Sequence, residues 1–214
     1  MDQTPEDALI EAIKAYDYPP ITYDFLGGRE RRFSSMINLD HFLQDLLLSG
    51  DMRSLKDGLS GILYWGHYRA GFRDHRVISF RTTVSDVQLQ NANEAIRHLD
   101  GTGLFGLKEI ELPQFSNMAF ITKFRTFLDP EHYCVLDSKI AKLGPLAIRL
   151  KRQRTYIPIN TQNDRAYRLW VDTCFSLASR LQIKHRPVDV ERGIFCLVDH
   201  RKVDLADQLL SAIA

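Results

Sequence analysis

A lysine and an aspartate, Lys123 and Asp137, are the side chains of this sequence whose types and surroundings are best suited to chemistry. The neighbours of Lys123 at a spacing of three and four residues include Ala119, Phe120 and Phe127, so its stem shares a helix face with apolar groups. Desolvation disfavours a charged ammonium, and a lysine made partly neutral in this way is a usable nucleophile. Lys123 is therefore a candidate nucleophile. The alternative is a structural lysine whose ammonium reaches solvent.

Asp137 follows Lys123 after a helix end and a short apolar segment. Asp129-Pro130 should stop the lysine helix, because a residue before proline is pushed out of the α region. From Lys123 the helix rises about 7.5 Å to its end, and four extended residues return about 13 Å, so Asp137 can come back beside Lys123. Asp137 also begins the next helix, so the alternative is that it only caps that helix.

Helical periodicity predicts the elements that position these residues. One apolar stripe in 39–48 should be buried, with Asp40 and Asp45 outside it, and it consists of Leu39, Phe42, Leu43, Leu46 and Leu47. A second stripe in 164–182 consists of Tyr167, Trp170, Val171, Cys174, Phe175, Ala178 and Leu181. Other helices are expected at roughly 5–16, 54–69, 85–98, 116–128, 138–143, 145–152, 188–198 and 203–212.

Strand signals occur only at 21–26, before Gly27-Gly28, and at 76–80. Two short strands do not make a sheet core, so we predict an all-α fold with at most a short β-hairpin. We expect one domain over residues 1–214, built as two helical lobes. The glycine-containing stretch 99–115 is expected to join the lobes, and clefts between lobes are favoured binding sites.

The charge of the chain is balanced overall and uneven locally. Its 214 residues hold 28 Lys and Arg against 27 Asp and Glu, a net charge of +1, so no global field indicates a nucleic-acid partner. Residues 138–163, here called the acid-free stretch, contain no Asp or Glu. A basic stripe of this kind would hold phosphates, and the alternative is a solvated helix face. Its basic residues are Lys139, Lys142, Arg149, Lys151, Arg152 and Arg154.

Several classes of protein and site are disfavoured by the same reading. The three cysteines and seven histidines are widely spaced, which argues against a disulfide framework and a metal site. No apolar run approaches the length of a membrane span, and residues 1–6 lack the basic and apolar regions of a secretory signal. We expect a cytoplasmic monomer that contacts no membrane.

Two segments around the lysine carry a family resemblance. Residues 122–130, Thr-Lys-Phe-Arg-Thr-Phe-Leu-Asp-Pro, and 135–141, Val-Leu-Asp-Ser-Lys-Ile-Ala, resemble bacterial 8-oxoguanine DNA glycosylase-like (OGG-like) proteins, which are distant members of the helix-hairpin-helix DNA glycosylase superfamily. Residues 186–195 are similar to the C-terminal helix of that family. With Tyr64-Trp65-Gly66, the resemblance covers most of 55–198. It implies a two-lobed helical bundle of the helix-hairpin-helix glycosylase type.

The resemblance also implies roles for two residues. In that superfamily a hairpin lysine attacks the sugar C1′ and an aspartate at the start of the next helix assists departure of the base, so these roles fall on Lys123 and Asp137. The usual Leu-Pro-Gly-Val-Gly hairpin has no counterpart, since residues 112–116 read Leu-Pro-Gln-Phe-Ser and contain no glycine. Lys123 also lies deeper in its helix than the usual lysine.

A base that is to be excised must first leave the base stack of the DNA, and an aromatic surface of the protein would receive it. The base-pocket candidates are Trp65, Tyr68, Phe72, Phe115 and Asn117. Leu63, Trp65 and Tyr68 recur at helical spacing, so the alternative is that these side chains belong to the core. The candidates for phosphate contact near these rings are Arg69, Arg73 and Arg76.

The function implied is excision of a damaged or modified, 8-oxoguanine-like base from double-stranded DNA, after the nucleotide has been flipped out of the helix. Abasic-site lyase activity through a Schiff base at Lys123 is implied as well. No metal or organic cofactor is implied. One alternative is a monofunctional glycosylase for an alkylated or hypermodified base, acting in repair or in defence against foreign DNA, in which Asp137 directs water. Another is an α-helical DNA-binding module without chemistry.

Overall fold

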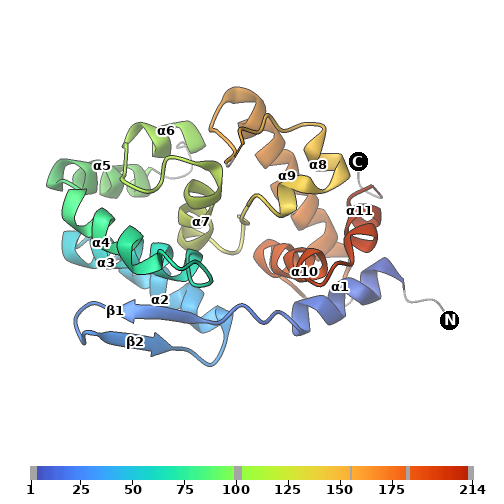
Figure 1. The fold of residues 1–214 in the computed structure, drawn as a ribbon, viewed down its shortest axis with the longest axis horizontal. Helices are drawn as coiled ribbons and strands as arrows, with labels where there is room; N and C mark the ends of the chain where they lie inside the picture. The colour runs from blue at the N-terminus through green and yellow to red at the C-terminus, as the bar shows by residue number, and fades with distance from the viewer. Residues whose placement is uncertain (1–3, 99–102, 155, 182–183, 212–214) are drawn as a thin grey trace. The chain divides into compact units, whose positions relative to one another are not determined.

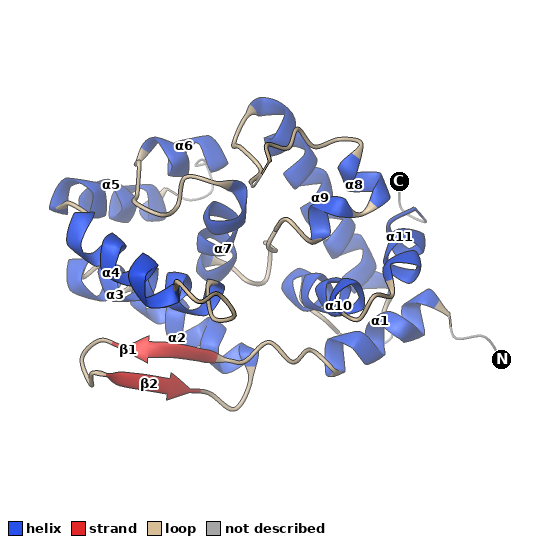
Figure 2. Ribbon diagram, viewed as in Figure 1, coloured by secondary structure: helices blue, strands red, loops and turns tan. Residues whose placement is uncertain are grey.

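The structure of the protein is a computed structural model that describes residues 4–98, 103–154, 156–181 and 184–211 (Figure 1). Its described part contains eleven α-helices, one short 3-10 helix and a two-stranded antiparallel sheet. The all-α prediction with a short β-hairpin is therefore confirmed. Figure 2 shows helices throughout the chain, with the two strands next to each other near its start.

The chain divides into two compact units. Unit 1 comprises Met1–Tyr18 and Pro130–Ala214, and unit 2 comprises Pro19–Asp129. The chain thus passes between the units at 18–19 and 129–130, and not near 99–115, where we expected the lobes to join. Residues 103–115 lie within unit 2 because the short helix α6 (Leu104–Glu109) buries Leu104 and Leu107 and packs against α5 (Asp86–Arg97) and α7 (Met118–Leu128). Residues 99–102 lie outside the described residues.

Unit 2 is organised around one buried helix, α3 (Met52–Gly66). Asp51 caps its start by accepting a hydrogen bond from the Ser54 amide at 2.7 Å. All residues from Asp57 to Trp65 are buried, because α3 packs against β1 and four other helices. The elements of unit 2 around it are β1 (Ile21–Asp24), β2 (Arg29–Arg32), α2 (Met36–Leu48), α4 (Arg73–Thr83), α5 (Asp86–Arg97) and α7 (Met118–Leu128).

The hairpin pairs Ile21 with Arg32 and Asp24 with Arg29. Its turn is fixed by the Asp24 carboxylate, which accepts hydrogen bonds from the amides of Leu26 and Gly27 at 3.0 and 2.9 Å. Gly28 has a φ of 65°, in the left-handed region that favours glycine. Only β1 was predicted as a strand, and the exposed, charged β2 has no apolar alternation to reveal it.

Two further predictions for unit 2 were wrong. Residues 76–80 belong to helix α4 rather than a strand, because Val77 and Phe80 are buried at helical spacing while Ile78 is 60% exposed. Asp40, expected outside the buried stripe of α2, is fully buried. Of that stripe, Leu39, Leu43 and Leu47 are buried as expected.

Unit 1 is organised around α10 (Pro187–Asp199), which packs against three helices, α1 (Pro5–Lys14), α9 (Thr161–Arg180) and α11 (Val203–Ser211). A close approach to α1 requires Gly193, since a Cβ there would lie 2.6 Å from Ile13 Cγ1. The α9 stripe is buried as predicted at Tyr167, Trp170, Cys174 and Ala178, whereas Phe175 is half-exposed.

The segment between Asp137 and α9 is less helical than predicted. In place of a helix over 138–143 there is a 3-10 helix, η1 (Ile140–Lys142), and the helix expected over 145–152 is the four-residue α8 (Gly144–Ala147). The described residues between Ala147 and Thr161 form no helix. Three apolar side chains of this irregular segment, Leu150, Ile157 and Ile159, are nevertheless buried.

Candidate active site

Lys123 lies in the middle of α7, the most buried helix of unit 2. Asn117 caps the helix, its side-chain oxygen accepting a hydrogen bond from the Phe120 amide at 3.2 Å, and Asp129 ends it before Pro130. Every residue from Phe120 to Leu128 is buried, and Lys123 itself is 8% exposed. The expected desolvation of the Lys123 stem is therefore confirmed, and Asn117, a base-pocket candidate, uses its amide oxygen as a cap.

The amine of Lys123 is held close to its own helix. Its Nζ donates a hydrogen bond to the Ala119 carbonyl at 3.4 Å and lies 5.1 Å from the centroid of the Phe120 ring. The last residue of α3, Gly66, makes room for this arrangement. A Cβ at Gly66 would lie 2.8 Å from Phe120 Cε1 and 3.2 Å from Lys123 Cδ. A larger residue would displace the lysine or the ring beside it.

His67, which follows Gly66, is the main residue of this site that sequence reasoning missed. Its ring lies on the Phe120 ring with centroids 4.4 Å apart and an interplanar angle of 31°. Burial, together with the positive charges of Lys123 and Arg76, lowers the pKa of His67 to about 4. His67 is therefore neutral at pH 7. A histidine directly after the buried Trp65-Gly66 was the available signal.

Phe72 and Arg76 extend the site onto the turn between α3 and α4. Phe72 is 51% exposed, and its ring meets the His67 ring edge-on with centroids 5.4 Å apart. The Arg76 guanidinium lies 5.3 Å from the Phe72 centroid and donates a hydrogen bond to Gln114 Oε1 at 2.8 Å. Gln114 in turn donates to Ser79 Oγ at 3.2 Å, from a backbone with φ of 70°. The first two turns of α4 are thus braced against the segment that precedes α7.

Two base-pocket candidates are core side chains of unit 2. Trp65 is 5% exposed and meets the Phe127 ring edge-on at 5.3 Å, and Phe115 is 1% exposed among other phenylalanines. In this structure neither ring offers an open face to a base, and for Trp65 this is the alternative raised by its helical spacing with Leu63 and Tyr68. Tyr68 is half-buried, with the Arg73 guanidinium 5.5 Å from its centroid.

The arginine of this turn, Arg69, and two arginines of α4, Arg73 and Arg76, differ in what holds them. Arg69 is exposed. Arg73 lies 3.9 Å from the Tyr64 centroid and forms ion pairs with Glu30 at 3.8 Å and Asp74 at 3.1 Å, so its charge is largely matched. Arg76 is exposed and bonds a neutral amide, so its positive charge remains available to an anion.

Asp137 belongs to unit 1, where its side chain caps the turn that leads into η1, the residue directly before this 3-10 helix being Lys139. Its Oδ1 accepts hydrogen bonds from the amides of Lys139 and Ile140 at 2.8 and 3.0 Å. Both bonds use Oδ1, so capping does not occupy Oδ2. The segment before Asp137 is fixed to α9, since Tyr167 Oη donates to the Cys134 carbonyl at 3.1 Å and Trp170 Nε1 donates to the Val135 carbonyl at 2.8 Å.

Three aromatic rings lie near Asp137 in unit 1. Tyr16, Tyr18 and Phe195 have centroids 6.3 to 6.5 Å apart. Burial raises the pKa of the Tyr16 hydroxyl well above its usual value, Arg192 opposes this, and the negative charges of Glu191 and Asp137 add to it. Sequence reasoning missed this cluster because its members come from α10 and from the segment after α1.

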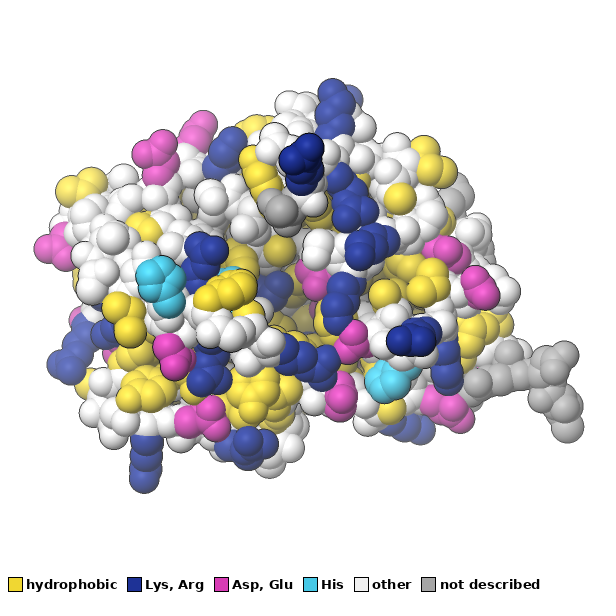
Figure 3. Space-filling view, in the orientation of Figure 1, with side chains coloured by type: hydrophobic (Ala, Val, Ile, Leu, Met, Phe, Trp, Pro, Cys, Tyr) yellow, Lys and Arg dark blue, Asp and Glu magenta, His cyan; other side chains and the backbone are white. Residues whose placement is uncertain are grey.

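The acid-free stretch keeps most of its basic side chains in solvent. Lys142, Arg149, Lys151, Arg152 and Arg154 are exposed, and Figure 3 shows Lys and Arg side chains gathered over the part of unit 1 that carries α8 and the segment after it. Buried Asn163 fixes the backbone here, accepting from the Lys151 amide and donating to the carbonyls of Lys151 and Pro158. Lys139 differs, because its ammonium pairs with Asp199 and lies 4.8 Å from the Phe195 centroid.

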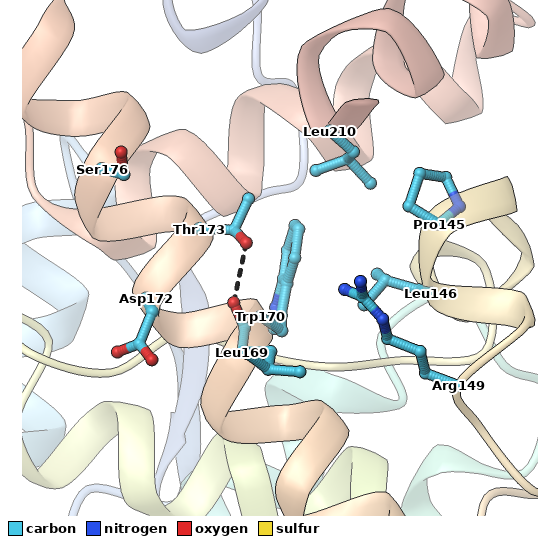
Figure 4. A pocket seen from close by; sticks show the side chains of 9 residues that line it. All are labelled: Pro145, Leu146, Arg149, Leu169, Trp170, Asp172, Thr173, Ser176 and Leu210. Atoms are coloured by element: carbon cyan, nitrogen blue, oxygen red, sulfur yellow. Dashed lines mark hydrogen bonds between the residues drawn. The ribbon is translucent and has the colours of Figure 1, made fainter. Parts of the chain in front are cut away.

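Unit 1 also contains a pocket of about 300 Å³ between α8, α9 and α11. Figure 4 shows Leu146, Arg149 and Leu210 facing Leu169 and Trp170 across it. The Thr173 hydroxyl on its wall is already used, because it donates to the Leu169 carbonyl at 2.7 Å. The lining is thus mainly apolar, with Arg149 as the cation at its edge.

Within the described residues, no group of three or more His, Cys, Asp or Glu side chains is placed to hold a metal ion. In the same part of the chain, no helix has the length and apolar character needed to cross a membrane. No protein-family model, curated protein or solved structure matches this chain. The arguments for its function therefore rest on its own residues and their geometry.

Proposed function

We propose that the protein is a DNA glycosylase that releases a damaged or modified base and that Lys123 forms a Schiff base with the remaining deoxyribose. The observation that carries this proposal is the placement of Lys123. Lys123 is 8% exposed in a buried apolar helix, and its Nζ lies 3.4 Å from the Ala119 carbonyl oxygen and 5.1 Å from the centroid of the Phe120 ring. Such a site suits an amine nucleophile better than it suits a structural cation.

In the proposed reaction, the Lys123 amine forms a bond to the sugar C1′ while the bond from C1′ to the base breaks. The base leaves with the bonding electrons and takes a proton from water. The lysine nitrogen then loses a proton, and the bond between C1′ and the ring oxygen O4′ breaks as O4′ gains a proton, which gives the Schiff base. Removal of a proton from C2′ breaks the bond between C3′ and oxygen, which cleaves the strand, and water finally hydrolyses the Schiff base and frees Lys123.

Asp137 has the proposed role of stabilising the positive charge that develops on the sugar as the base departs. A carboxylate aimed at a developing charge is worth more in the transition state than in the ground state. Because its capping bonds use Oδ1, Oδ2 can serve this purpose without loss of the cap. The exposed cations of the acid-free stretch are proposed to contact phosphates without reading sequence.

The test is borohydride trapping on a panel of duplexes that each carry one modified base. We expect a covalent complex with the native protein and none with Lys123→Gln, while Lys14→Gln, which changes an exposed lysine of α1, should trap normally. A thermal melt of each variant checks that the fold is retained.

Base release and strand cleavage are scored separately on the same panel. Release without trapping or cleavage would replace the proposal with a monofunctional glycosylase, in which Asp137 directs water. Tight binding without release from any duplex would leave only a DNA-binding module. Undiminished trapping by Lys123→Gln would show that another residue is the nucleophile.

A further inference from the structure

The turn between α3 and α4 exposes a large apolar side chain that the fold does not bury. Phe72 is 51% exposed, and it stands at the start of α4 without a side-chain capping bond. Exposing a phenylalanine ring forgoes the favourable transfer of that ring out of water. The ring is nevertheless held in place, edge-on to His67 and beneath the Arg76 guanidinium. A fixed, exposed aromatic ring at a turn is suited to insertion into a partner.

The cationic side chains around Phe72 indicate nucleic acid as that partner, since the one adjacent carboxylate in the sequence, Asp74, already pairs with Arg73 at 3.1 Å. Arg69 and Arg76 are exposed on either side of it in the sequence, and Arg76 bonds only the neutral amide of Gln114 among the contacts described above. Proteins that unstack DNA insert an apolar side chain between base steps and use nearby basic residues on the backbone. An acidic peptide would use the arginines but would gain little from a single ring.

The exposed ring is also linked to the proposed nucleophile through direct contacts within unit 2. Phe72 contacts His67 with centroids 5.4 Å apart, His67 lies on Phe120 at 4.4 Å, and Lys123 Nζ lies 5.1 Å from the Phe120 centroid. Gly66 allows Phe120 and Lys123 to pack this closely against α3. Phe72, the side chain that would enter the base stack of DNA, is therefore held in the same packed unit as the Lys123 amine.

We infer that Phe72 is an intercalating residue, which enters the base stack of duplex DNA and occupies the space that a flipped nucleotide leaves. This inference rests on the proposed function, because a flipped nucleotide is what a glycosylase requires. It differs from a role as a wall of the base pocket. A pocket wall contacts the base in any substrate, whereas an intercalating residue is needed only where a stack must be opened.

The first test compares single-turnover base release from duplex and from single-stranded substrate. Phe72→Ala should slow release from duplex about ten-fold or more and leave release from single strand within about two-fold. Phe72→Trp should restore most of the duplex rate, because it keeps a ring that can stack. Ile78→Ala, which removes another exposed apolar side chain of α4, should match the native protein on both substrates. Equal losses on both substrates, or no loss on duplex, would overturn the inference.

A second test does not depend on base release. In a Lys123→Gln background, duplex DNA with 2-aminopurine beside the target base should brighten on binding, because unstacking relieves quenching. The double variant Lys123→Gln with Phe72→Ala should lose most of this signal. If the signal is absent or does not depend on Phe72, the inference is wrong even where base release stands. If the signal depends on Phe72 but no duplex loses a base, the proposed function fails and the intercalating role remains.

Discussion

Lys123 in unit 2 and Asp137 in unit 1 are positioned by different kinds of interaction. Lys123 is held by packing, since Phe120 lies beside it, Gly66 leaves room for it and its amine donates to a carbonyl of its own helix. Asp137 is held by polar bonds to backbone amides and by a preceding segment that two side chains of α9 fix in place. Packing removes a side chain from water, whereas bonds to amides fix the direction in which a carboxylate points.

This difference fits the two proposed roles. A nucleophilic amine benefits from an environment that disfavours its charged form, and an electrostatic stabiliser needs to keep its charge. It follows that the two residues should respond to different perturbations. Changes of volume should affect Lys123, and changes of charge should affect Asp137.

The largest effect is expected from removing the charge of Asp137 while keeping its cap. Asparagine caps a helix about as well as aspartate, so the free energy of unfolding of Asp137→Asn should lie within about 0.5 kcal/mol of that of the native protein. Its single-turnover rate of base release should nevertheless fall by about two orders of magnitude or more, with DNA affinity within a few-fold, because a charge that acts in the transition state adds little to binding.

A matched variant separates the cap from the charge. Asp137→Ala removes both, so it should also lose about 1 kcal/mol of stability, measured by denaturant unfolding. Full activity in a folded Asp137→Asn variant would show that this residue is only a cap.

The next largest effect is expected from crowding Lys123. Gly66→Ala places a Cβ 2.8 Å from Phe120 Cε1 and 3.2 Å from Lys123 Cδ, so we expect a loss of about 1–3 kcal/mol of stability from overpacking. Trapping by borohydride should also slow, because the lysine or its neighbouring ring has to move. Gly144→Ala is the control, since its Cβ would meet its nearest neighbour, Asp207, at an ordinary 3.7 Å. An unchanged trapping rate in Gly66→Ala would mean that packing does not set the position of the amine.

The same contrast explains which parts of the site were predictable from sequence. The burial of the Lys123 stem follows from spacing along one helix, and the Asp137 cap follows from a local start signal, so both were predicted and confirmed. His67 and Phe120 meet across two helices that are distant in sequence, and no local pattern encodes that contact. Periodicity also cannot show which of several aromatic residues lies outside the core, as Trp65 and Phe72 illustrate.

The elements that were predicted incorrectly have local causes. The β-branched and aromatic residues of 76–80 are typical of a strand, but contact of α4 with α3 imposes a helix. The glycines of 99–115 indicated a linker, yet two leucines are enough to dock α6 within unit 2. In both places tertiary packing decides the structure and outweighs the local preference.

The smallest effect is expected from pH and concerns the neutral His67. Its pKa is about 4 in the folded protein and about 6.5 when unfolded, so between these values the unfolded chain binds more protons. Stability should therefore fall as the pH is lowered from about 6.5 to about 4, and be fully present above that window. The loss of unfolding free energy assignable to His67 should be about 1–2 kcal/mol, because its ring is only partly buried and solvent screens part of the effect.

Denaturant unfolding across this pH range measures the loss. We expect His67→Gln to lose that part of the pH dependence and His41→Gln, which changes an exposed histidine, to keep it. If the stability of His67→Gln follows the native pH dependence throughout, burial beside Lys123 does not hold His67 neutral. The inference that the surroundings of Lys123 and His67 are removed from water would then be wrong.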